Sequence, residues 1–312
     1  MPDYGSTKRH PFVSLILLLL IILVCAFVFT LTGLLTAGII YGFSEVTKFL
    51  SSDLSNQPLI KLVQIFSSIG TFVAPAIIYA RLADSDWRSY LKLNTAVPVL
   101  FLFTIIIMFF STPLIELSIE INRNMKLPAI LKNAEEWMRN QENQMAELTK
   151  QLLTMKTVTA LMVNLIMIAV IPAIGEELIF RGCFQRIFKD LFKNNHLAVW
   201  TTAIIFSAIH MQFFGFIPRM LLGAMFGYLL VWSNTLWLPI LAHFVNNAAA
   251  VITAYVYQQQ GKSLDQLDQP EKSSWFIYVL SLLATAVFLW GFYQNAKKRN
   301  TVLEKGNGAR LG

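Results

Sequence analysis

Two adjacent carboxylates stand between apolar stretches near the middle of the chain, where residues 171–182 read IPAIGEELIFRG. Neighbouring side chains on a helix point about 100° apart, so Glu176 and Glu177 face different ways. Glu177 and Arg181 are four residues apart and can form an ion pair on one helix face. This pairing leaves Glu176 as an unpaired carboxylate, which can exchange a proton with water in a dry site. Taken alone, the pattern favours a charged cluster that ends a membrane span over a catalytic site.

Imidazole and amide groups occur in two later apolar stretches. Phe206 and His210 are four residues apart, and His243 and Asn247 repeat this spacing with Asn246 beside them. A histidine and an amide that project together can hold an anion or polarise a substrate carbonyl. The alternative is that these groups form hydrogen bonds between packed membrane helices.

Together these groups predict a hydrolytic site. Among the 18 carboxylates of the chain, only Glu176 and Glu177 adjoin the predicted core. His210 and His243 are the only histidines inside predicted membrane segments. A carboxylate can activate water as a general base, while imidazole and amide groups orient the water or stabilise the oxyanion.

The elements that position these groups are predicted to be membrane helices. The 312 residues are 55% hydrophobic and 14% charged, against about 25% charged residues in soluble proteins. This composition excludes two soluble domains and predicts an all-α polytopic membrane bundle of about eight transmembrane helices. The expected spans lie within Phe12–Phe43 and at about Leu59–Ala80, Val97–Leu117, Val158–Gly175, Leu197–Phe214, Phe216–Trp232, Leu238–Tyr257 and Trp275–Tyr293. The first is too long for a cleaved signal peptide.

The chain is expected to form one integral membrane domain in three parts. Residues 1–157 supply three spans and an extramembrane loop, residues 158–257 the catalytic core, and residues 258–312 the last span and a polar tail. The loop Glu120–Lys150 has the apolar spacing of an amphipathic helix on the membrane surface, although a solvated connection fits equally well. Lys and Arg are more frequent on the side of the termini, which predicts that both termini are cytoplasmic.

Partners and cell type follow from the same features. The net charge of +7 is interpreted as a topology signal, so nucleic acid is not expected as a partner. The two cysteines, Cys25 and Cys183, provide neither a disulfide framework nor a cysteine zinc site. The compact chain with short loops favours a bacterial plasma membrane, with the lipid bilayer as its surroundings.

The three motifs resemble those of the CPBP family, which groups type II CAAX prenyl endopeptidases with bacteriocin-processing and immunity-associated (Abi-like) membrane proteins. The matching residues lie in about 158–256 and are Glu176, Glu177, Arg181, Phe206, His210, His243 and Asn247. The resemblance implies hydrolysis of a peptide bond within the membrane, in a peptide or membrane-protein substrate. It implies that Glu176 is the general base, assisted by His210, and that His243 and Asn247 stabilise the oxyanion. Glu177, Arg181 and Phe206 are then supporting residues.

A metal-dependent mechanism is the alternative, with zinc on Glu176, His210 and His243. The chain has no His-Glu-x-x-His motif, and Asn247 holds the position four residues after His243, so a reaction without metal or cofactor is favoured. Two other classes of function remain open: a non-enzymatic immunity or scaffold protein of the same fold, and a transporter with a Glu and His proton relay.

The depth of the candidate residues is a difficulty for this interpretation. The site is expected toward the cytoplasmic side. His243 lies six residues into its predicted span, about 9 Å, whereas His210 lies thirteen residues into its own, about 20 Å. A tilted helix, or a fifth span that starts later than Leu197, would bring the two histidines together.

Overall fold

The computed structural model describes residues 9–265 and 273–308, and every regular element in these ranges is helical. Within these ranges, seven helices are long and apolar enough to cross a membrane. The polytopic helical bundle predicted from composition is therefore confirmed, and the protein is an integral membrane protein.

The α-helices of the first half precede the site-bearing region. Their bounds are α1 Pro11–Tyr41, α2 Phe43–Leu50, α3 Gln57–Ser68, α4 Ala74–Ala83, α5 Trp87–Tyr90, α6 Pro98–Arg123 and α7 Lys132–Leu153. A π-helical segment, η1 Ile69–Val73, joins α3 to α4, and a 3₁₀ turn, η2 Ala129–Leu131, precedes α7.

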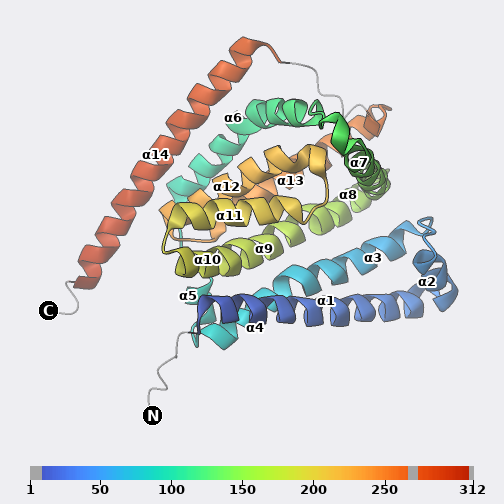
Figure 1. Ribbon diagram of the computed structural model, residues 1–312, viewed down its shortest axis with the longest axis horizontal. Helices are drawn as coiled ribbons and strands as arrows, with labels where there is room; N and C mark the ends of the chain where they lie inside the picture. The colour runs from blue at the N-terminus through green and yellow to red at the C-terminus, as the bar shows by residue number, and fades with distance from the viewer. Residues whose placement is uncertain (1–8, 266–272, 309–312) are drawn as a thin grey trace.

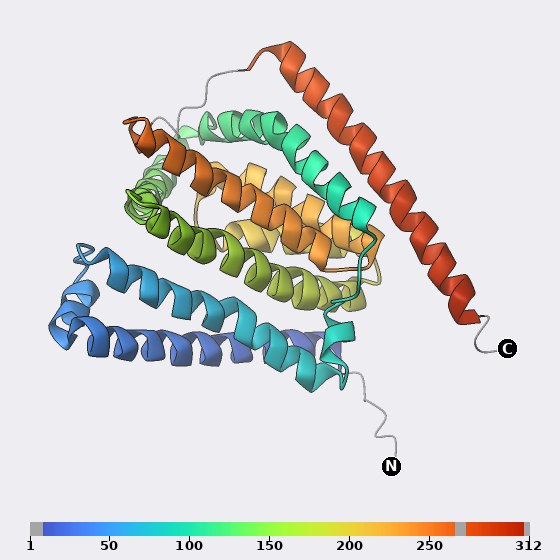
Figure 2. The ribbon, with the colours of Figure 1, turned by 180° about the vertical axis from the view of Figure 1, so that it is seen from behind.

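The helices of the second half carry the candidate residues. Their bounds are α8 Val158–Asn164, η3 Leu165–Val170, α9 Ile171–Glu177, η4 Leu178–Phe184, α10 Gln185–Phe192, α11 Asn195–Ala208, η5 Phe213–Gly215, α12 Phe216–Ser233, α13 Trp237–Gln259 and α14 Trp275–Gly308. Here η3 and η4 are π-helical and η5 is a 3₁₀ turn. Figure 2 shows α13 between α6 and the helix that contains α9.

The first and last helices reach the same end of the bundle, called here the terminal end (Figure 1). Arg9, just before α1, donates a hydrogen bond from Nη1 to the carbonyl of Leu82, 3.2 Å away. Arg299, in α14, donates from Nη1 to the carbonyl of Ser233 at the end of α12, 3.0 Å away. The opposite end carries α2 and α7 and is called the α7 end.

The fourth predicted span is much longer than expected. A continuous helix of 35 residues runs from Val158 to Phe192 instead of ending at Gly175. The carboxylate pair therefore lies in the middle of a membrane helix rather than at its boundary. Pro172 is tolerated because the π-helical segment η3 interrupts the regular hydrogen-bond pattern directly before it.

The fifth predicted span, Leu197–Phe214, is wrong as a single helix. The corresponding helix α11 has 14 residues and ends at Ala208, about 21 Å at 1.5 Å per residue. After it the chain turns at Met211, which has a left-handed backbone with φ of 54°. The apolar composition continues across this turn without Gly or Pro, so the sequence did not reveal it.

The predicted extramembrane helix is present as α7, which contains no buried residue. This helix packs against the turn and the short helix η5 that follow α11. The ring of Trp137 is 5.3 Å from the ring of Phe213, and the guanidinium of Arg139 lies 4.3 Å from the ring centre of Phe214.

Candidate active site

A buried ion pair forms the inner wall of the site. Arg181 Nη1 lies 2.7 Å from Glu177 Oε1, and both side chains are 0% exposed. This is the pair that the four-residue spacing predicts. The second arm of the guanidinium donates from Nη2 to the carbonyl of Gly223, 3.0 Å away on α12. Gly223 also lets α12 approach α11 closely, because a Cβ there would lie 3.2 Å from the Phe206 ring and 3.3 Å from the Ala203 backbone.

The same carboxylate orients the histidine of α13. His243 Nδ1 lies 2.9 Å from Glu177 Oε1. Because the carboxylate accepts, the ring donates its proton from Nδ1. The other ring nitrogen, Nε2, then faces Glu176, whose Oε2 is 3.8 Å away. The ring of Phe226 stacks on the imidazole at a centroid distance of 5.4 Å, which further fixes its plane.

His210 reaches the site from the turn after α11. Its Nδ1 lies 2.7 Å from the carbonyl oxygen of Phe206. A carbonyl can only accept, so Nδ1 carries the proton and Nε2 of the neutral ring keeps a lone pair. The ring of Phe206 lies 5.1 Å from that of His210 and 6.0 Å from that of His243. Phe206 thus spaces the two imidazoles.

Asn247 is held one turn further along α13. Its Nδ2 donates to the carbonyl of Ile168, 3.0 Å away, and its Oδ1 accepts from Nδ2 of Asn246 at 3.1 Å. Ile168 is four residues before Pro172, and a proline has no N–H to donate to that carbonyl. Pro172 therefore leaves the Ile168 carbonyl available to the Asn247 amide.

The candidate residues surround a cavity of about 720 Å³. Its wall includes Glu176, Phe206, His210, His243 and Asn247. Glu177 and Arg181 are not part of this wall and lie behind it. The structure thus brings the predicted residues together, with Glu176 facing the cavity and Glu177 facing the protein interior, as the helix geometry predicts.

The long helix removes one part of the depth difficulty, the position of the carboxylates. Glu177 lies 15 residues before the end of that helix at Phe192, about 22 Å, and His210 lies in the turn that directly follows α11, a helix about 21 Å long. These two residues therefore lie at similar depth, and the predicted helix end at Gly175 was wrong. His243 reaches the same cavity from six residues into α13.

The cavity extends toward the α7 end. Its wall includes Arg123 at the end of α6 and Glu142 on α7. The terminal end lies on the other side. In this fold the cavity opens on the side opposite the chain termini. The expectation that the site faces the cytoplasm and the expectation that both termini are cytoplasmic therefore cannot both be correct.

One charged residue of the cavity was missed as a site residue. Arg219, in α12, lines the cavity, and its Nη2 donates to Gln212 Oε1 at 2.5 Å. The sequence contained the signal, because Arg219 is an ionisable residue inside the predicted span Phe216–Trp232, and such residues indicate function by default.

The alternative zinc ligands are not assembled into one group. Among the described residues, no three His, Cys, Asp or Glu side chains lie close enough together to hold a metal ion. The geometry therefore offers no ready zinc site on Glu176, His210 and His243. A reaction without metal stays a prediction.

Fold and site together define a polytopic helical membrane protein with an ionisable site in its core. Residues 158–249 match the model of the family described as type II CAAX prenyl endopeptidase Rce1-like. The resemblance seen in the three motifs is thereby confirmed. The match covers 92 of the 312 residues, and the family is described as one of prenyl endopeptidases.

A curated relative is similar to part of the chain. The chain is 26% identical over 116 residues to the uncharacterized protein YpbD of Bacillus subtilis (strain 168), which covers 36% of this chain and 57% of YpbD. The chain thus aligns with little more than half of that relative. No solved structure matches.

Proposed function

We propose that the protein is an intramembrane endopeptidase in which Glu176 activates the attacking water. The observation that carries this proposal is the position of Glu176 Oε2, 3.8 Å from Nε2 of His243 on the wall of the cavity. A water molecule beside both groups can lose its proton to the carboxylate as it attacks a peptide carbonyl.

The histidines then act in different protonation states. His210 keeps Nδ1–H on the Phe206 carbonyl, so its free Nε2 can accept a hydrogen bond from the water and assist Glu176. His243 holds Nδ1–H on Glu177. In its protonated form it also donates from Nε2.

The tetrahedral intermediate needs donors for its oxyanion. The imidazolium of His243 supplies one, and the second N–H of the Asn247 amide supplies another. Collapse of the intermediate transfers the proton held by Glu176 to the leaving amine, which completes hydrolysis without a covalent enzyme intermediate.

The substrate proposed for this cavity is a peptide segment of a membrane-associated protein or lipopeptide. Apolar side chains of Ile115, Ile119 and Leu222 line the cavity beside the charged groups. Such a wall accommodates apolar residues or a lipid chain on either side of the scissile bond.

The test is cleavage of a diverse peptide and lipopeptide library by purified protein, analysed by mass spectrometry. Glu176→Gln keeps the size of the side chain and removes the base, so cleavage should fall by at least about 100-fold. The matched control is Glu136→Gln on α7, whose side chain is 61% exposed; it should cleave as the wild type does. Full cleavage by folded Glu176→Gln would refute the proposal.

A further inference from the structure

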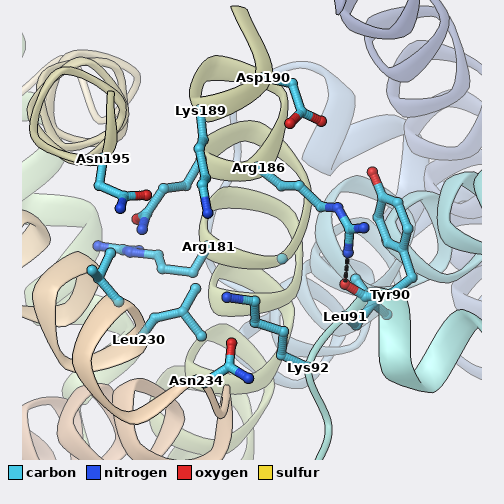
Figure 3. A pocket seen from close by; sticks show the side chains of 13 residues that line it. Tyr90, Leu91, Lys92, Arg181, Arg186, Lys189, Asp190, Asn195, Leu230 and Asn234 are labelled. Atoms are coloured by element: carbon cyan, nitrogen blue, oxygen red, sulfur yellow. Dashed lines mark hydrogen bonds between the residues drawn. The ribbon is translucent and has the colours of Figure 1, made fainter. Parts of the chain in front are cut away.

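A second pocket lies at the terminal end, separated from the cavity by the Arg181–Glu177 pair. Its volume is about 370 Å³. It is bounded by η4 and α10, by the connection between α5 and α6, and by the end of α12 (Figure 3). Arg181 lines this pocket while its guanidinium is paired with Glu177, so the pair forms the floor between the two spaces.

Positive charge is concentrated in this pocket. The ammonium groups of Lys92 and Lys189 both end in its middle (Figure 3). Within the described part of the chain, neither lysine has an ion pair with a carboxylate. Asp190 lies on the rim as the pocket's acidic group.

Arg186 adds a third cation. Its Nη1 donates to the carbonyl of Tyr90 at 2.7 Å, and its guanidinium lies 3.9 Å from the centre of the Tyr90 ring. Both partners are uncharged, so the arginine is fixed in place and keeps its charge. Neutral donors are also present, because the amides of Asn195 and Asn234 line the same pocket.

The positive charges that line the pocket repel one another. Burial lowers the pKa of Lys92 to about 8, and the nearby charges of Lys189 and Arg186 add to this effect. Lys92 follows α5 and lies outside the membrane-spanning helices. An anion in the pocket would relieve this repulsion, and amides would complete its hydrogen bonds.

We propose that this pocket binds a phosphate group, carried by an anionic lipid or by a soluble phosphate. Basic pockets between membrane helices near the membrane surface match the headgroups of anionic lipids. The pocket lies where the long helix ends at Phe192, which is a suitable depth for a headgroup. This inference is independent of the proposed peptidase activity.

The test uses the full-length protein in nanodiscs of phosphatidylcholine. In one arm inorganic phosphate is added, and in the other phosphatidylglycerol is included in the disc. The thermal midpoint and native mass spectrometry report binding. We expect the wild type to bind at least one probe. Binding only in the second arm identifies a lipid, and binding in the first arm identifies a soluble phosphate.

The pocket variant is Lys92→Gln combined with Lys189→Gln. Each lysine near a membrane surface contributes about 1 kcal/mol to anion binding, so the loss of two lysines should lower the affinity by roughly 30-fold. The control is Lys193→Gln with Lys298→Gln, which removes two charges from exposed positions of the same end. Because Lys189 is exposed, the single Lys189→Gln variant serves if the pair fails to fold, with an expected loss of about fivefold.

The proposal is overturned if wild-type protein binds neither probe, or if pocket and control variants bind equally well. The pH provides a second readout with phosphatidylglycerol, whose phosphodiester charge is constant. Lys92 loses its charge as the pH rises through about 8, so binding should weaken from pH 7 to pH 9. A Lys92→Arg variant should remove this dependence, whereas an unchanged dependence would contradict the role of Lys92.

Discussion

At the residue scale, the carboxylate of Glu177 both pairs with a buried arginine and orients a histidine of the site. Glu177 Oε1 contacts both Arg181 and His243, at 2.7 and 2.9 Å. The first contact followed from four-residue spacing on one helix. The second joins residues 66 positions apart and depends on how α13 packs against α9. No local pattern could supply it.

Replacing Glu177 should therefore affect stability as well as the site. Glu177→Gln leaves the guanidinium of Arg181 buried without its carboxylate, and breaking such a pair costs about 3–5 kcal/mol. Unfolding by urea in a mild detergent would measure this change. Lys132→Gln, which breaks an exposed pair at 3.7 Å with Glu136, should change stability by less than about 1 kcal/mol. Equal stability of Glu177→Gln and wild type would refute the structural role of the pair.

At the element scale, two irregular backbone positions shape the site: the helix around Pro172 and the turn at Met211. A proline cannot continue the regular hydrogen-bond pattern of a helix, so Pro172 can be recognised as an irregular position from its residue type alone. The sequence could not reveal that the carbonyl of Ile168, which Pro172 cannot bond, would receive the Asn247 amide, because that contact is made between two helices. The turn at Met211 was hidden for a related reason, since its left-handed backbone is adopted by a residue without the usual glycine signal.

The substitution Pro172→Ala tests this connection. Alanine restores an N–H that competes with Asn247 for the Ile168 carbonyl, while it favours the helix. We expect unchanged or increased thermal stability and about fivefold lower kcat/KM, the effect of one hydrogen bond of ~1 kcal/mol. Pro75→Ala is the matched control, because Pro75 also follows a π-helical segment, η1, but lies outside the cavity wall. An unchanged kcat/KM in Pro172→Ala would contradict this account.

At the scale of the whole molecule, the terminal end and the mouth of the cavity face opposite sides of the membrane. The hydropathy of the chain indicated the helical bundle and most of its spans. The side on which the cavity opens depends on which ends of α6 and α13 line it. This cannot be predicted from hydropathy, because it is decided by how the helices pack.

This arrangement predicts opposite labelling of two introduced cysteines. Asn140→Cys on α7 and Lys193→Cys at the terminal end are both exposed positions, while the native Cys25 and Cys183 are buried. In sealed vesicles, a membrane-impermeant maleimide should label one variant in right-side-out and the other in inside-out preparations. Labelling of both variants from the same side would contradict the fold. If the termini are cytoplasmic, Asn140→Cys should react from outside the cell.

The helix that lies across the cavity mouth has a further consequence. Because α7 contains no buried residue and meets the core through partly buried side chains such as Leu153, local opening of this helix requires little free energy. Its amide hydrogens should therefore exchange with deuterium much sooner than those of the helix that carries Glu176, as mass spectrometry of peptic fragments would show. The width of the cavity opening in this conformation therefore does not limit the size of the substrate peptide that enters. The helix at the opening, α7, can move aside at a low cost in free energy.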